Sequence, residues 1–134
     1  MALIVLSAAT AVILLALDAV MLTLVMKPLF ITHIGPLMRD SPLPLPAAIF
    51  YLGYTAGLIY LVSWPAFRDG TPVLLPAAVL GAVAYGTYEF TSMVIMKDWS
   101  WQMVATDVIW GTVVTAFSAW AACAIVKALG YSAQ

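Results

Sequence analysis

Residues 85–111, with the sequence YGTYEFTSMVIMKDWSWQMVATDVIWG, decide how this chain folds. They place Glu89 and Asp107 in two segments that are otherwise apolar enough to cross a bilayer, with a short turn containing Lys97 and Asp98 between them. A carboxylate at the centre of a membrane helix costs about 2.5–3.5 kcal/mol on insertion scales. Two such residues in adjacent segments therefore require a structural or functional explanation.

The composition of the whole chain places it in a membrane. Of its 134 residues, 65% are hydrophobic and 8% are charged, and the mean hydropathy is +1.08. These values lie far from those of a soluble domain. The net charge of -1 and the lack of a basic run give no reason to expect nucleic acid as a partner. Cys123 is the only cysteine, so neither an internal disulfide nor a cysteine metal site can form within one chain.

Four apolar segments are long enough to span a hydrocarbon core of about 30 Å at a rise of about 1.5 Å per residue. They cover residues 2–26, 46–67, 72–96 and 99–129. The sequence therefore predicts an all-α membrane protein, with four transmembrane helices in an up-down bundle with short loops. Residues 1–134 are expected to form one domain.

Prolines mark the longest predicted connection. Lys27 and Pro28 are expected to end the first helix, because proline removes a backbone donor and clashes with the preceding turn. Residues 28–34 are then expected to form a short interfacial turn. The sequence SPLPLP at 41–46 predicts an extended, polyproline-like linker.

The other helix ends carry capping residues. Thr71 and Pro72 are predicted as the N-cap and first position of the third helix. Asp98 or Ser100 is predicted to cap the fourth helix, which is expected to begin near Trp99.

Small and aromatic residues suggest packing faces and membrane boundaries. Gly53 and Gly57 are four residues apart and predict a face for close helix approach. Trp99 and Trp101 are expected at one membrane interface, and Trp120 at the other.

Three acids fall at one predicted depth. In an up-down bundle, the first helix ends and the fourth begins on the same membrane face. Asp18, Glu89 and Asp107 each lie seven or eight residues from a predicted helix end on that face, roughly 10–12 Å below it. The three carboxyls are therefore expected to face one another inside the bundle.

Helical spacing adds partners for these acids. Tyr85, Glu89 and Ser92 are related by i, i+4 and i+7, and Trp110 follows Asp107 by three residues. The candidate ligand-binding or proton-binding residues are Asp18, Tyr54, Thr55, Tyr85, Glu89, Ser92, Asp107 and Trp110. Because no Lys or Arg lies well inside a predicted span, at least one carboxyl is expected to be protonated near neutral pH, or to bind a cation.

These residues resemble a family of bacterial predicted membrane proteins catalogued as domain of unknown function 2177. The family pattern favours Asp, Asn and Trp where this chain has Glu89, Ser92 and Met21. The resemblance implies a multi-pass protein of the bacterial inner (plasma) membrane and supplies no activity. The matching pieces are Leu17-Asp18-Ala19, Tyr51, Tyr54, Gly57, residues 85–91, Trp99-Ser100, Asp107 and Trp110-Gly111.

Several functions fit this pattern. The acids can form a structural polar core that holds the helices together, or a small-ligand or proton/cation site. They can also belong to a membrane-embedded enzyme acting on a lipid, although no Ser/His pair, Cys/His pair or metal-spaced histidines support one. No catalytic residue is assigned, and no cofactor or metal is expected. The expected partners are membrane lipids, and the chain is compatible with a homo-oligomer or with an accessory role in a larger membrane complex.

Overall fold

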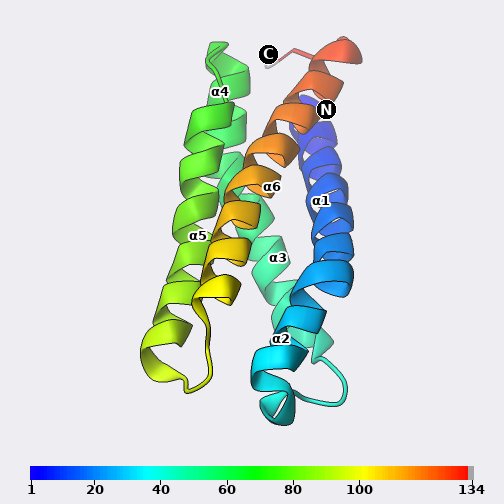
Figure 1. The fold of residues 1–134 in the computed structure, drawn as a ribbon. Coiled ribbons are helices and arrows are strands. Elements are labelled where there is room, and N and C mark those ends of the chain that lie inside the picture. The colour runs from blue at the N-terminus through cyan, green and yellow to red at the C-terminus, as the bar shows by residue number, and fades with distance from the viewer. Residues whose placement is uncertain (133–134) are drawn as a thin grey trace.

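The computed structural model describes residues 1–132 and is 85% helical, with no strand among those residues. Its four long helical spans are apolar enough to cross a membrane. The prediction of an all-α membrane protein with four transmembrane helices is confirmed. Figure 1 shows the spans alternating in direction, with both termini at one end of the bundle. The last two residues of the predicted 1–134 domain lie outside the described residues.

Two of the spans are composite. The first contains α1, a π-helical segment η1, α2 and a 3₁₀ turn η2, while the second contains α3, a π-helical segment η3 and α4. The third and fourth spans are the single helices α5 and α6. The bounds are Ala2–Met21 (α1), Leu22–Met26 (η1), Lys27–Ile34 (α2), Gly35–Leu37 (η2), Pro44–Leu58 (α3), Ile59–Ser63 (η3), Trp64–Asp69 (α4), Leu74–Ile95 (α5) and Trp101–Ala128 (α6).

The prediction that the first helix ends near Met26 is wrong, because the helical span continues to Leu37. Residues 28–34, expected as an interfacial turn, lie entirely in α2. The SPLPLP stretch is extended only at its start, since α3 begins at Pro44. Residues 38–43 and 96–100 together form what we call the loop end of the bundle.

A widened turn explains how the first span passes through a proline. The segment η1 ends two residues before Pro28, and η3 ends two residues before Pro65. In each case the residue before the proline donates its N–H to the carbonyl five residues back, at the end of the π-helical segment. This wider register accommodates the proline ring, which would clash with the carbonyl four residues earlier in a regular α-helix.

Glycines bring α5 and α6 into close contact. A Cβ atom added to Gly81 would lie 2.3 Å from the carbonyl oxygen of Gly111, and one added to Gly111 would lie 2.1 Å from Cγ of Tyr85. Only glycine permits this approach, which sets the Tyr85 ring directly against α6. The predicted packing face of Gly53 and Gly57 is wrong within this chain, since an added Cβ would meet nothing within 4 Å at either position.

The turn between α5 and α6 differs from its prediction at Trp99. Ser100 is the N-cap of α6, and its hydroxyl accepts the N–H of Met103 at 3.1 Å, as expected of a cap. Trp99 precedes the cap, so it lies outside the helix. Asp98 has a φ of 66°, in the left-handed region, and this conformation reverses the chain before Trp99. At the other end of α5, the helix begins at Leu74 rather than at the predicted Pro72.

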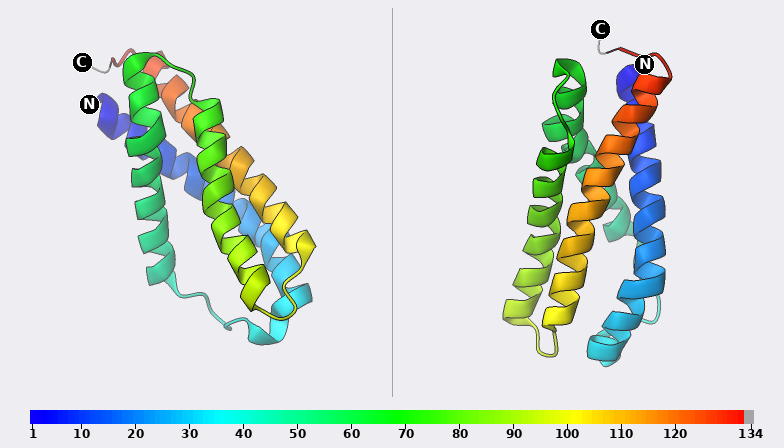
Figure 2. Two further views of the ribbon diagram at one scale, coloured as in Figure 1. Left: turned by 90° about the vertical axis from the view of Figure 1, so that its left-hand side faces the viewer. Right: turned by 45° about the horizontal axis from the view of Figure 1, so that its top comes forward.

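The two ends of the bundle are packed differently. Near the termini, small and branched side chains such as Leu6, Leu58 and Ala122 are fully buried in one apolar cluster. Toward the loop end, α3 and α5 diverge from each other, which is clearest in the left view of Figure 2. The three buried acids of the spans, Asp18, Glu89 and Asp107, lie in this half of the bundle.

Replacing Gly81 with alanine is expected to destabilise the fold. The added methyl would collide with the backbone of α6, and overpacking of this kind costs about 1–3 kcal/mol. The thermal unfolding midpoint of the purified protein in detergent would measure the loss. Gly53→Ala is the matched control, because its Cβ enters open space and alanine favours the helix. Equal midpoints for the two variants would contradict the close contact between α5 and α6.

Candidate functional site

Asp18 connects four spans through hydrogen bonds. Its Oδ2 accepts the hydroxyls of Tyr51 on α3 and Tyr85 on α5, the latter at 3.3 Å. Its Oδ1 accepts the indole N–H of Trp110 on α6 at 2.8 Å. Only 4% of Asp18 is exposed. All three groups are donors, so the side chain of Asp18 acts only as an acceptor in these bonds.

Glu89 and Asp107 form a second acidic group. Glu89 is completely buried, and its Oε1 accepts the indole N–H of Trp99 at 3.1 Å. Its Oε2 has no hydrogen-bond partner among the described residues. The carboxyl of Asp107 is adjacent to that of Glu89, but no well-formed hydrogen bond joins the two groups.

The acids occupy two neighbouring layers rather than one depth. Tyr85, which contacts Asp18, lies one helical turn before Glu89 on α5, and Trp110 lies about one turn after Asp107 on α6. The Asp18 layer is therefore roughly 5 Å further from the loop end than the other two acids. The first span continues well past its predicted end, which explains why the estimate from sequence merged the layers.

A cavity of about 350 Å³ joins the two layers. Asp18 and Asp107 both line it, so each acidic layer contributes a carboxyl to its wall. Phe50 on α3 and Tyr88 on α5 also line it, and 49% and 53% of these residues are exposed. The cavity therefore reaches the surface between α3 and α5. The remaining lining residues are Leu22, Met26, Phe30, Tyr51, Ala84 and Tyr85.

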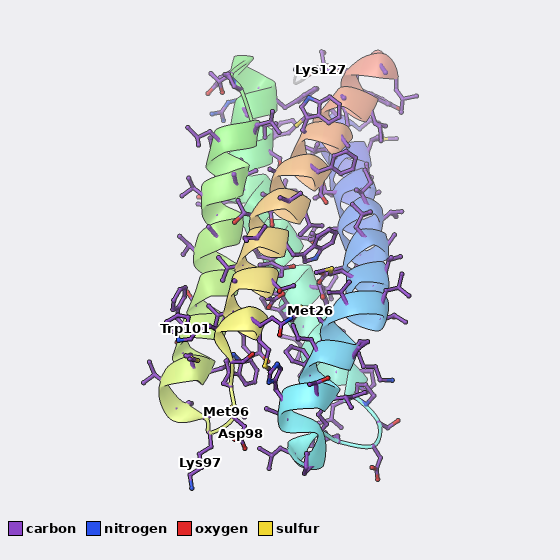
Figure 3. The ribbon with its side chains drawn as sticks, viewed as in Figure 1. Met26, Met96, Lys97, Asp98, Trp101 and Lys127 are labelled. Carbon is purple, nitrogen blue, oxygen red and sulfur yellow. The ribbon has the colours of Figure 1, made fainter. Side chains whose placement is uncertain are left out.

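Basic side chains lie away from the acids. Figure 3 shows Lys97 extending away from the bundle at the turn between α5 and α6, and Lys127 at the opposite end. Lys27 is exposed. In the part of the chain that the structure describes, the one ion pair joins the exposed side chains of Arg68 and Asp69.

Three of the residues predicted for the site do not bond to its carboxyls. The hydroxyl of Tyr54 pairs with that of Thr115 at 2.6 Å, which links α3 to α6 instead. Thr55 is buried and lines a separate groove of about 830 Å³ between α1 and α3. Ser92 is buried on the same stripe of α5 as Tyr85 and Glu89, as its spacing predicts, but it does not bond to either acid.

Two donors were missed by the sequence analysis. Tyr51 is not among the predicted site residues, although its position three residues before Tyr54 indicates the same helix face. Trp99 was expected at the membrane interface but is 7% exposed. Its ring packs against Phe30 and Tyr88, with ring centres 5.7 Å from each, and so covers the loop-end side of the cavity lining.

A family model described as "Predicted membrane protein (DUF2177)" matches residues 3–124. The chain belongs to the DUF2177 family. The match spans all three acids and the aromatic donors around them. No curated protein and no solved structure matches the chain.

The DUF2177 description agrees with the four spans and names no activity or ligand. A function is therefore inferred from the geometry of the site. Among the described residues, no group of three His, Cys, Asp or Glu side chains could hold a metal ion. What this DUF2177 protein presents is a pair of adjacent carboxyls, a third carboxylate saturated by donors, and an aromatic-walled cavity between the two layers.

Trp99→Phe is expected to destabilise this DUF2177 protein by about 1–3 kcal/mol, because it leaves a buried carboxyl oxygen of Glu89 without its donor. Phenylalanine keeps an aromatic ring against Phe30 and Tyr88. Chemical unfolding in detergent would measure the change in the free energy of unfolding. Trp101→Phe is the control, since 65% of Trp101 is exposed. A Trp99→Phe variant as stable as the control would rule out this role for the Trp99–Glu89 bond.

Proposed function

We propose that this protein binds and exchanges a proton or another small cation inside the membrane, at the adjacent carboxyls of Glu89 and Asp107 and beside that of Asp18. The proposal depends on one observation, that no positively charged side chain balances the buried acids. The three carboxyls are at least nine-tenths buried, and no basic side chain forms an ion pair with any of them in the described chain. Buried charge without a partner is so costly in an apolar medium that the site favours the uptake of a positive charge.

The pair of Glu89 and Asp107 is the exchanging part of the proposed site. Two adjacent carboxylates repel each other strongly where the dielectric constant is low, and one shared proton removes most of that repulsion. The unpartnered Oε2 of Glu89 supports this role, since protonation would give Glu89 a donor for the neighbouring carboxyl. The two groups then titrate as a unit.

Asp107 provides the pair with a route to the outside. It lines the cavity, whereas Glu89 is completely buried and is not part of the cavity wall. A proton or cation arriving through the cavity therefore meets Asp107 first. Asp18, on the same wall, already accepts hydrogen bonds from three donors, so it is a fixed acidic neighbour of the exchanging pair.

A structural polar core is the second candidate, and the observation that favours it concerns Asp18. Its hydrogen bonds tie α1 to α3, α5 and α6, as a residue that specifies helix packing would do. The same explanation does not extend to the other acids. Glu89 has one hydrogen bond and a free oxygen, and adjacent carboxyls weaken packing unless they hold a positive charge.

Infrared spectroscopy of the purified protein tests the proposal. The carbonyl band of a protonated carboxyl is expected to change with pH in the wild type, and to lose its buried component in Glu89→Gln and in Asp107→Asn. Asp40→Asn and Asp98→Asn are the controls, because both acids are exposed in loops. If the Glu89 and Asp107 variants show the same titrating band as the wild type, the acid pair is not the exchanging group.

We also propose the bacterial inner membrane as the location, with the loop end in the cytoplasm. The resemblance to a bacterial family supports the first part of this assignment. The distribution of positive charge supports the second, since cytoplasmic loops carry an excess of Lys and Arg. The loop end and the segment leading to it carry Lys27, Arg39 and Lys97, against Arg68 and Lys127 at the end near the termini.

Cysteine labelling would check the orientation. On a Cys123→Ala background, a cysteine at Ser41→Cys is expected to resist a membrane-impermeant thiol reagent in intact cells and to react in inverted vesicles. Thr71→Cys, at the opposite end, is expected to show the reverse pattern. Both native residues are exposed, so access to the reagent depends on the membrane side alone. Labelling of Ser41→Cys in intact cells would reverse the proposed orientation.

A further inference from the structure

The walls of the cavity are mainly aromatic. Five rings line it, contributed by α2, α3 and α5. The face of an aromatic ring carries partial negative charge and attracts cations, most strongly where water is excluded. Neither a proton nor a small metal ion needs such walls, whereas an organic cation does. The rings belong to Phe30, Phe50, Tyr51, Tyr85 and Tyr88.

Asp107 provides a counter-charge for such a cation. It is nine-tenths buried, it lines the cavity, and its neighbour is the carboxyl of Glu89 rather than a basic side chain of the described residues. Two adjacent carboxyls that share one proton still carry one negative charge, which Asp107 can present to a cation in the cavity. Asp18 lies on the same wall and already has three donors, so it contributes charge without needing a ligand.

The other residues that line the cavity favour a ligand whose body is apolar. Leu22, Met26 and Ala84 complete the wall, and no Lys, Arg or His is among the lining residues. An anionic group such as a phosphate would therefore meet two acids and no cation. A cavity of about 350 Å³ lies at the small end of the range for ligand sites, so it suits a compact molecule.

The cavity opens toward the bilayer. Its two most exposed lining residues, Phe50 and Tyr88, lie on α3 and α5, the two helices that diverge toward the loop end. An amphipathic molecule dissolved in the membrane can therefore enter sideways, between these helices. Both a free amine and the ammonium group of a lipid headgroup carry the required chemistry.

We infer that the cavity between α3 and α5 binds an ammonium cation attached to an apolar body, with Asp107 as its counter-ion and the aromatic rings as its cage. This inference rests on the proposed function, because it names the class of cation for the same acidic site. It adds a ligand, a counter-ion and an entry route that proton exchange alone does not require.

Equilibrium binding of benzyltrimethylammonium to the purified protein in an uncharged maltoside detergent tests the inference. The wild type is expected to bind this cation at least about tenfold more tightly than it binds neopentylbenzene, in which a carbon atom replaces the nitrogen, since cation–π attraction and the carboxylate both act on charge alone. Equal affinity for the two compounds, or no binding of the cation, would overturn the inference.

Two pairs of variants locate the site. Asp107→Asn is expected to lower the affinity for benzyltrimethylammonium about tenfold or more, with Asp98→Asn unchanged. Phe50→Leu is expected to lower it about threefold, and Phe90→Leu, an equally exposed phenylalanine that packs on Trp101 away from the cavity, is the control. Phe50→Leu keeps a half-exposed apolar residue, so it tests the cavity even if the acid variant does not fold. Equal affinity in Phe50→Leu and Phe90→Leu would place the ligand elsewhere.

Competition separates the two sources of the ligand. If a lipid headgroup is the occupant, added phosphatidylethanolamine will displace benzyltrimethylammonium and phosphatidylglycerol will not. If a free amine is the occupant, neither lipid will compete, and the cation will still bind. An acid pair that titrates in the infrared experiment while the protein binds no ammonium compound would overturn this inference and leave the proposed function standing.

Discussion

The carboxylate of Asp18 is the interaction on which the rest of the structure depends. It accepts hydrogen bonds from Tyr51, Tyr85 and Trp110, and so joins the first span to each of the other three. Apolar contacts between helices differ little from contacts with lipid tails, so they do not by themselves fix how the helices rotate. Because the donors to Asp18 must all point at one group, they set the faces of α3, α5 and α6 that meet inside the bundle.

This arrangement places the second acidic layer. With Tyr85 directed at Asp18 and held against Gly111, the next turn of α5 brings Glu89 toward α6, where Asp107 lies. Trp99 then completes the layer from the turn. The same geometry leaves space between α3 and α5, and that space becomes the cavity. The hydrogen bonds of one carboxyl thus account for the direction of Tyr85 against α6 and for the wall of the cavity between α3 and α5.

The sequence was sufficient for the number of spans and for the inward direction of the acids, because hydropathy and helical spacing are local properties. It did not predict that Trp99 is buried. This burial depends on the left-handed conformation of Asp98 and on the N-cap of α6, which is one residue after the predicted start of that helix. It also misjudged Pro28, because a proline ends most helices and only the wider turn before it reveals a continuous span. The hydroxyl of Tyr54 pairs with Thr115 on α6 and not with an acid, because its partner depends on how the helices pack and not on spacing along one helix.

The position of the cavity opening, between α3 and α5, also determines which phase can supply a ligand. A molecule that enters there comes from the hydrocarbon phase of the membrane. The concentration that governs its binding is therefore its mole fraction among the lipids and not its molarity in water. Apparent dissociation constants will therefore shift with the lipid-to-protein ratio, and a compound with weak intrinsic affinity will still saturate the cavity if it partitions strongly into the bilayer. Occupancy then reports on membrane composition as much as on the solution outside.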